Sequence, residues 1–124
     1  MTEFWALGFG GFLGATARYY LVHFTNRLLG SGFPYGTLAV NILGCFLLGF
    51  IATAAEDKFS ISPVVRTFLT VGILGAFTTF STFSYETIAL VRAGNVAVAF
   101  ANIFLSLAVG ILAAYVGISV SKMI

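Results

Sequence analysis

The chain has 124 residues and a formal net charge of +2, and 60% of its residues are hydrophobic while only 8% are charged. Its mean hydropathy of +1.05 excludes an ordinary soluble domain and assigns the chain to the integral membrane proteins. The six basic residues are spread along the sequence, which contains no phosphate-binding loop, zinc-ligand spacing, nucleophile elbow or paired carboxylates. We therefore expect neither nucleic-acid binding nor enzymatic activity.

Long apolar runs predict four membrane-spanning helices within one all-α domain, residues 1–124. A helix needs about 20 predominantly apolar residues to cross a bilayer. The predicted helices cover approximately residues 4–24, 35–55, 64–92 and 96–120. The first run follows the acidic Glu3 and has no small-residue cleavage pattern, so we expect no removable signal peptide.

The first predicted helix combines a face of small residues with one charged side chain. Gly10 and Gly14 lie four residues apart, a spacing that lets a neighbouring helix approach closely. Arg18 lies about 9 Å inside the predicted helix end at Phe24. This side chain either reaches the membrane interface or supplies a fixed positive charge in a wet vestibule or at a dimer seam.

The second predicted helix carries a polar stripe formed by Thr37, Asn41 and Gly44. An amide near the middle of an apolar helix either joins two helices through hydrogen bonds or lines an ion path. Both interpretations of Asn41 remain open from this helix alone.

The third predicted helix contains a segment, Thr78 to Ser84, in which every residue is a hydroxyl residue or a phenylalanine. An unpaired polar group at membrane depth is unfavourable, so hydroxyls there either bond back to their own helix or face a water-lined path. Five hydroxyls in seven residues, preceded by Gly72 and Gly75, favour a broken helix with its break near residues 75–79. Freed backbone groups and hydroxyls at such a break can coordinate an ion.

Two phenylalanines and one acid complete this segment. Phe80 and Phe83 either pack against a neighbouring helix or present the positive edges of their rings to an anion. Glu86 has three possible roles: an interfacial residue, a proton carrier or a vestibule acid.

The fourth predicted helix places Asn102, Ser106 and Gly110 at four-residue steps, so that they share one face. Polar stripes on the second, third and fourth helices together predict a polar path between the helices.

The distribution of basic residues bears on membrane orientation. With four spans, both termini and the second loop lie on one side of the membrane. The basic residues are Lys58, Arg66 and Lys122 on that side, and Arg27 and Arg92 on the other. Because the placement of Lys and Arg sets orientation, this near balance predicts insertion in both directions and an antiparallel, dual-topology homodimer.

These features favour a passive channel lined by hydroxyls, amides and phenylalanine edges. The alternative is a small proton-coupled exporter resembling the small multidrug-resistance family, which also has four short helices and dual topology. Such exporters use a membrane-embedded carboxylate in their first helix, where this chain has Arg18 and no acid between residues 4 and 24. A structural or assembly subunit is a third possibility, although it would not need aligned polar stripes.

The sequence resembles the Fluc-type (CrcB-like) fluoride channels along essentially its whole length. The resemblance rests on GGFLGATARY, FPYGTLAVNILGCFLLG, GILGAFTTFSTFSYE and the fourth helix. It implies a dual-topology homodimer in the bacterial inner membrane, with two antiparallel fluoride paths and a central structural sodium ion. Passive export of fluoride through such a channel would protect the cell from fluoride toxicity.

The resemblance also implies residue roles. Matching the motifs residue by residue gives these assignments: Phe80 and Phe83 as pore phenylalanines, Asn41 as the pore amide, Ser81 and Thr82 as hydroxyls near the path, Ser106 as a lining residue, Arg18 and Glu86 as vestibule charges, and Gly75 and Thr78 as residues whose backbone carbonyls hold sodium. One departure lies before Arg18, where the chain reads GATARY and the family pattern has a proline after the alanine.

Overall fold

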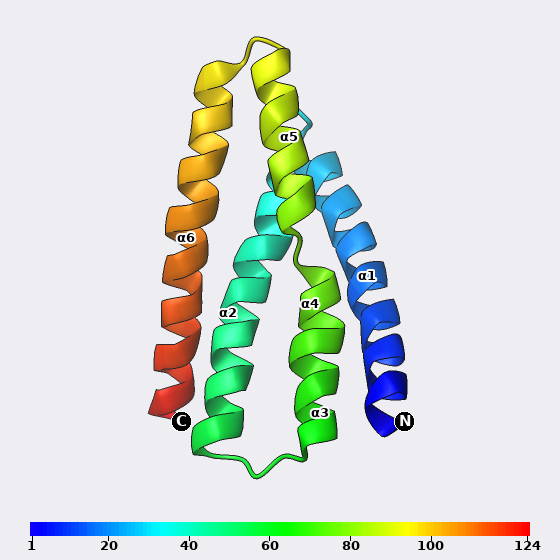
Figure 1. The fold of residues 1–124 in the computed structure, drawn as a ribbon. Coiled ribbons are helices and arrows are strands. Elements are labelled where there is room, and N and C mark those ends of the chain that lie inside the picture. Colours follow the sequence, from blue (N-terminus) through cyan, green and yellow to red (C-terminus); the bar gives the residue numbers. More distant parts are fainter.

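The computed structural model describes residues 1–124 and is entirely helical (Figure 1). The helices are α1 (Thr2–Leu29), α2 (Tyr35–Asp57), α3 (Pro63–Thr67), the π-helical turn η1 (Phe68–Ile73), α4 (Leu74–Phe77), α5 (Phe80–Arg92) and α6 (Val96–Met123). The segments α3, η1, α4 and α5 follow one another along the third predicted helix, with an interruption between α4 and α5. We call them together the third rod. Both termini lie at the same end of the molecule as the α2–α3 loop, and the α5–α6 turn lies at the other end (Figure 1).

Three helical segments are long and apolar enough to cross a membrane: Tyr35–Asp57, Pro63–Arg92 and Val96–Met123. The prediction of four spans is therefore confirmed for three of them. The remaining helix, α1, has 28 residues and is about 42 Å long, so its length suffices. Its glycines, its tyrosines and Arg18 lower its hydropathy below that of the other three.

The helix ends differ from the predicted bounds, most clearly in α1. This helix ends at Leu29 instead of residue 24 because the chain leaves it only at Gly30, whose φ of 90° lies in the left-handed region that favours glycine. Arg18 consequently lies eleven residues from the end of α1, about 16 Å instead of 9 Å. The α2 and α6 helices also extend past the predicted residues 55 and 120, to Asp57 and Met123.

Glycines allow the helices to pack backbone against backbone. A Cβ atom placed at Gly10 would lie 2.8 Å from the Cα of Gly72, and one at Gly14 would overlap the carbonyl of Ile73. The predicted packing face of the first helix is thus confirmed, and its partner is the third rod. Gly49 and Gly117 play the same part between α2 and α6, where added Cβ atoms would overlap the carbonyls of facing residues.

The third rod changes direction between α4 and α5. Thr78 has φ −86° and ψ 159°, and Thr79 has φ −153° and ψ 119°, so both residues are extended. The α5 helix then starts at Phe80 with Thr79 as its N-cap, because the Thr79 hydroxyl accepts a hydrogen bond from the Thr82 amide at 3.2 Å. Two extended residues therefore separate two helical segments. Gly75, within the predicted range 75–79, is still helical.

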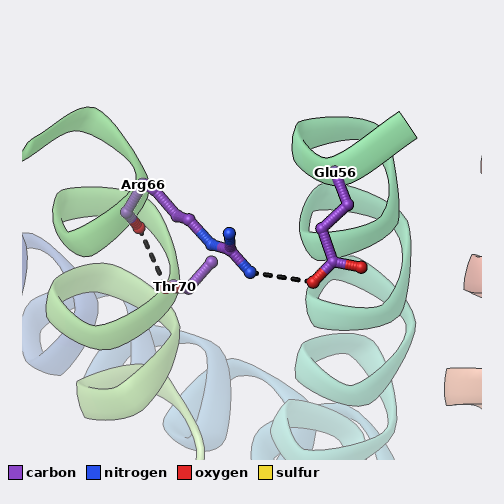
Figure 2. A network of polar contacts seen from close by, with 3 residues as sticks. All are labelled: Glu56, Arg66 and Thr70. Atoms are coloured by element: carbon purple, nitrogen blue, oxygen red, sulfur yellow. Dashed lines mark hydrogen bonds and ion pairs between the residues drawn. The ribbon is translucent and has the colours of Figure 1, made fainter. Parts of the chain in front are cut away.

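The end of α2 is joined to the third rod by an ion pair (Figure 2). Arg66 Nη2 lies 2.9 Å from Glu56 Oε1, and the two side chains are 47% and 59% exposed. The Thr70 hydroxyl donates to the Arg66 carbonyl one turn earlier, at 2.9 Å. An exposed pair of this kind contributes about 0 to 1 kcal/mol, so it orients the loop more than it stabilises the fold.

Candidate functional site

The second of the two extended residues, Thr79, is held by one side-chain amide from α2. Asn41 Nδ2 donates to the Thr79 carbonyl at 2.9 Å, and the Thr79 amide donates to Asn41 Oδ1 at 2.8 Å. One side chain thus satisfies both backbone groups of a residue that has no helical partner. Asn41 joins two helices, which is the first of the two roles considered for it.

This pairing and the Thr79 cap of α5 change the surroundings of two backbone carbonyls. In a continuous helix the Gly75 carbonyl would accept from the Thr79 amide, which here donates to Asn41. The Thr78 carbonyl would accept from the Thr82 amide, which donates to the Thr79 hydroxyl. No backbone amide donates to the Thr78 carbonyl. Both carbonyls therefore lack the donor that an uninterrupted helix would supply.

The hydroxyls of the segment divide into two groups. Thr78 Oγ1 and Ser84 Oγ each donate to a carbonyl one turn earlier, both at 3.0 Å. The Thr79 hydroxyl instead lies 3.0 Å from that of Thr82 and 3.4 Å from that of Ser81. Thr78 and Ser84 therefore bond back to their own helical turns, whereas the hydroxyls of Thr79, Ser81 and Thr82 cluster at the start of α5.

A cavity of about 300 Å³ lies between α2, the third rod and α6. We call it the central cavity. Its lining includes six of the residues predicted for the site: Asn41, Gly75, Thr78, Phe80, Phe83 and Ser106. The Phe80 and Phe83 rings lie with their centroids 5.7 Å apart at an interplanar angle of 48°. Asn41 therefore lines a cavity as well as joining two helices.

A second cavity, of about 270 Å³, brings Arg18 of α1 together with Thr82 and Thr79. We call it the arginine cavity. Thr79 lines both cavities, so they adjoin at this residue. His23 also lines the arginine cavity, and its ring contacts the Tyr19 carbonyl through Nδ1 at 2.7 Å.

The remaining predicted residues lie apart from these two cavities. Glu86 lines a third cavity of about 220 Å³ near the α1–α2 connection and accepts a hydrogen bond from the buried Thr37 hydroxyl. Ser81 is exposed and lines none of these three cavities. The stripe on α2 thus faces the third rod, with Thr37 bonded to Glu86 and Asn41 to Thr79.

Gly44 belongs to the same stripe, and a side chain of the third rod occupies the space next to it. A Cβ atom at Gly44 would overlap Cγ2 of Thr78. The Thr78 methyl group therefore fills the space next to Gly44.

Sequence reasoning did not single out Thr79 or Thr87, although each makes a hydrogen bond to a side chain of another helix. Thr79 was one of five similar hydroxyl residues, and nothing in the sequence sets it apart from its neighbours. Thr87 accepts a hydrogen bond from Asn102 Nδ2 at 3.0 Å. The only available signal was that Asn102 lies on the polar face of the fourth helix.

Sequence comparison with known proteins identifies the family of this chain. Residues 5–118 match the family described as CrcB-like protein, Camphor Resistance (CrcB). The chain belongs to the CrcB-like family. As a member of this family with three segments able to span a bilayer, it is a multi-pass membrane protein.

Three curated CrcB-like relatives carry the name "Fluoride-specific ion channel FluC". The protein from Clostridium perfringens (strain ATCC 13124) is 45% identical over 118 residues, which is 95% of this chain and 92% of the relative. The protein from Dehalococcoides mccartyi (strain CBDB1) is 47% identical over 117 residues, covering 94% and 90% of the two chains. The protein from Hydrogenovibrio crunogenus is 46% identical over 117 residues, covering 94% and 89%.

Proposed function

We propose that this chain forms a passive, fluoride-selective ion channel in the bacterial cell membrane and lets fluoride leave the cell down its electrochemical gradient. The observation that carries the proposal is the Asn41–Thr79 pairing, which holds a helix interruption beside a cavity lined by an amide, hydroxyls and two phenylalanines. Relatives about 45% identical over most of the chain are named fluoride-specific ion channels.

Attraction and dehydration of the anion are assigned to different residues. Arg18 supplies a fixed positive charge to the arginine cavity, so anions concentrate there. The Thr82 hydroxyl in that cavity and the Ser81 hydroxyl beside it are donors that replace water around the anion. Thr79 leads from this cavity to the central one, where Asn41 and Ser106 follow.

Selectivity then depends on ion size and donor strength. Fluoride is small and strongly hydrated, so it gains from close hydrogen-bond donors and from the positive ring edges of Phe80 and Phe83. Chloride is larger and interacts more weakly with the same donors. Glu86 bonds to Thr37 at the far end of the stripe, where we assign it the role of a vestibule acid.

The channel is proposed to be an antiparallel, dual-topology homodimer in which α1 is the fourth membrane span. Phe80 lines the central cavity yet is 76% exposed in the single chain. A second copy covering this face would enclose the ring and close the cavity. The nearly even distribution of basic residues between the two ends of the helices supports insertion in both orientations.

A structural sodium ion is proposed at the centre of this dimer, held by the carbonyls of Gly75 and Thr78. The donor set fits, because both are neutral oxygens that have lost their helical amide partners. These neutral carbonyl oxygens would supply sodium with ligands that replace its hydration water. The chain's own part is to keep these carbonyls free: Asn41 accepts from the Thr79 amide in place of Gly75, and the Thr79 hydroxyl accepts from the Thr82 amide in place of Thr78.

Fluoride efflux from liposomes tests the proposed function. Purified protein is reconstituted into vesicles loaded with potassium fluoride, valinomycin is added to carry potassium, and an ion electrode records the released fluoride. We expect rapid fluoride release, and no chloride release from matched chloride-loaded vesicles. Absence of fluoride release, together with proton-driven uptake of a cationic dye, would replace the channel by the small multidrug-type exporter.

A further inference from the structure

The α6 helix contains a buried amide that lines none of the cavities described above. Asn102 is 2% exposed within one of the most apolar segments of the chain. Both ends of its amide are bonded: Nδ2 donates to Thr87 Oγ1 at 3.0 Å, and Oδ1 accepts from Ser106 Oγ at 3.4 Å. A buried polar group that is this fully paired specifies one arrangement of the helices around it.

From Asn102 the chain of hydrogen bonds continues into α5, with each group donating to the next. The Thr87 hydroxyl, itself 7% exposed, accepts from Asn102 and donates to the Phe83 carbonyl at 2.7 Å. A hydroxyl has one hydrogen and two lone pairs, so it can serve both neighbours at once. The amide of α6 is thereby connected to the turn of α5 that carries Phe83.

Both ends of this network reach the central cavity, although its middle does not. Phe83 and Ser106 line the cavity, whereas Asn102 and Thr87 lie behind them. We infer that Asn102 and Thr87 are positioning residues that fix how α5 is rotated against α6, and hence where the Phe83 ring and the Ser106 hydroxyl lie along the ion path. This inference rests on the proposed channel function.

The way α5 is connected to the rest of the chain explains why side-chain contacts are needed to fix its rotation. Because α5 starts directly after two extended threonines, no continuous helix before it fixes its rotation about its own axis. Its far end leads through the Ala93–Asn95 turn, with Gly94 at φ 87°, directly into α6. The Thr87–Asn102 hydrogen bond joins the two helices within the membrane-spanning part, one turn after Phe83. The Thr37–Glu86 hydrogen bond ties the same turn of α5 to α2, so the Thr87–Asn102 bond is the side-chain hydrogen bond that ties it to α6 and sets the ring relative to that helix.

The test separates the number of working channels from the rate of each channel. Protein is reconstituted at less than one channel per vesicle. The fraction of vesicles that empties then counts assembled channels, and the speed of emptying gives the fluoride flux per channel. A residue needed only for folding changes the fraction, whereas a positioning residue changes the speed.

Thr87→Val is the decisive variant because it keeps the shape of the side chain and removes the hydroxyl. We expect the flux per channel to fall about fivefold or more while the emptied fraction stays close to that of the unaltered protein. Thr87→Ser, which keeps the hydroxyl, should retain most of the flux. The matched control is Ser119→Ala, which removes a hydroxyl that bonds only back to Tyr115 in its own helix, at 2.9 Å, and should change neither quantity.

A double variant tests whether Asn102 and Thr87 act through the same hydrogen bond. If they do, Asn102→Leu combined with Thr87→Val lowers the flux per channel no further than Thr87→Val alone. A normal flux per channel in Thr87→Val, with or without fewer emptied vesicles, would overturn the positioning role. If the unaltered protein released no fluoride, the proposed function itself would fail, which is a distinguishable result.

Discussion

The Asn41 side chain and the Thr79 backbone form a reciprocal pair of hydrogen bonds at 2.9 and 2.8 Å. The amide of α2 thus takes the place of the helical partners that Thr79 lacks. By drawing the Thr79 amide away from Gly75, it also keeps open the interruption between α4 and α5. Two features of the proposed path depend on this contact: the free carbonyl of Gly75 and the extended conformation of Thr79, whose hydroxyl caps α5.

Removing the Asn41 amide should therefore impair both stability and flux. Asn41→Leu leaves the amide and the carbonyl of Thr79, a residue only 8% exposed, without partners, and each costs about 1 to 3 kcal/mol. We expect a lower thermal unfolding temperature in detergent and a fluoride flux reduced about tenfold or more. Cys45→Ala, one turn along α2 in the same cavity wall, is the control. Normal flux in Asn41→Leu would show that the pairing is dispensable.

Gly44 and Thr78 should behave as a complementary pair. Gly44→Ala places a methyl group where Thr78 Cγ2 now lies, and such overpacking costs about 1 to 3 kcal/mol. The threonine cannot turn away freely, because its hydroxyl bonds to the Leu74 carbonyl at 3.0 Å. We expect Gly44→Ala to lower fluoride flux measurably.

Adding Thr78→Ser should restore much of this loss. Serine keeps the hydroxyl and the backbone carbonyl of residue 78 but lacks the overlapping methyl group. Flux in the double variant should exceed that in Gly44→Ala alone. An equal or lower flux would indicate that Gly44 acts through some contact other than Thr78.

The two phenylalanines should contribute to permeation and not to assembly. Phe80→Ile and Phe83→Ile keep apolar bulk and remove the positive ring edges, so each should depress fluoride flux while the protein still elutes as an assembled species in size-exclusion chromatography. Flux measured in liposomes checks the first part of this expectation. Unchanged flux in both variants would remove the rings from the mechanism.

Sodium removal should reduce activity if the Gly75 and Thr78 carbonyls hold a structural ion. Protein purified and assayed with N-methylglucamine in place of sodium should release fluoride more slowly, and added sodium should restore the rate. Thr78→Ser retains the carbonyl, so it should keep the same dependence. Identical rates in the two cations, after exhaustive exchange, would count against the proposed site.

The amino-acid sequence was sufficient for those features that depend on local composition. Apolar runs placed the helices, and the spacing of Gly10 and Gly14 identified a packing face that the structure confirms. The longer α1 was missed because its last turns, with Asn26 and Arg27, resemble a polar loop. The helix ends where Gly30 adopts a left-handed backbone conformation, and the sequence alone does not show which glycine adopts it.

The pairings within the site were harder to predict because they join distant parts of the chain. Asn41 and Thr79 are 38 residues apart, and neither hydropathy nor spacing specifies which hydroxyl residue the amide meets. The same applies to Asn102 and Thr87, whose contact depends on how α5 leaves the extended threonines. The polar stripes and the hydroxyl-rich segment indicated most of the residues around the central cavity, and the family resemblance added their individual roles, which remain predictions.

The most direct test of the central claim is the reversal potential of the current through the purified protein in a planar lipid bilayer under a fluoride gradient. A passive fluoride channel predicts that the current reverses at the fluoride equilibrium potential. This value should not move when chloride is varied or when a pH difference is imposed across the bilayer. A reversal potential that follows the pH difference or the chloride gradient would contradict the account.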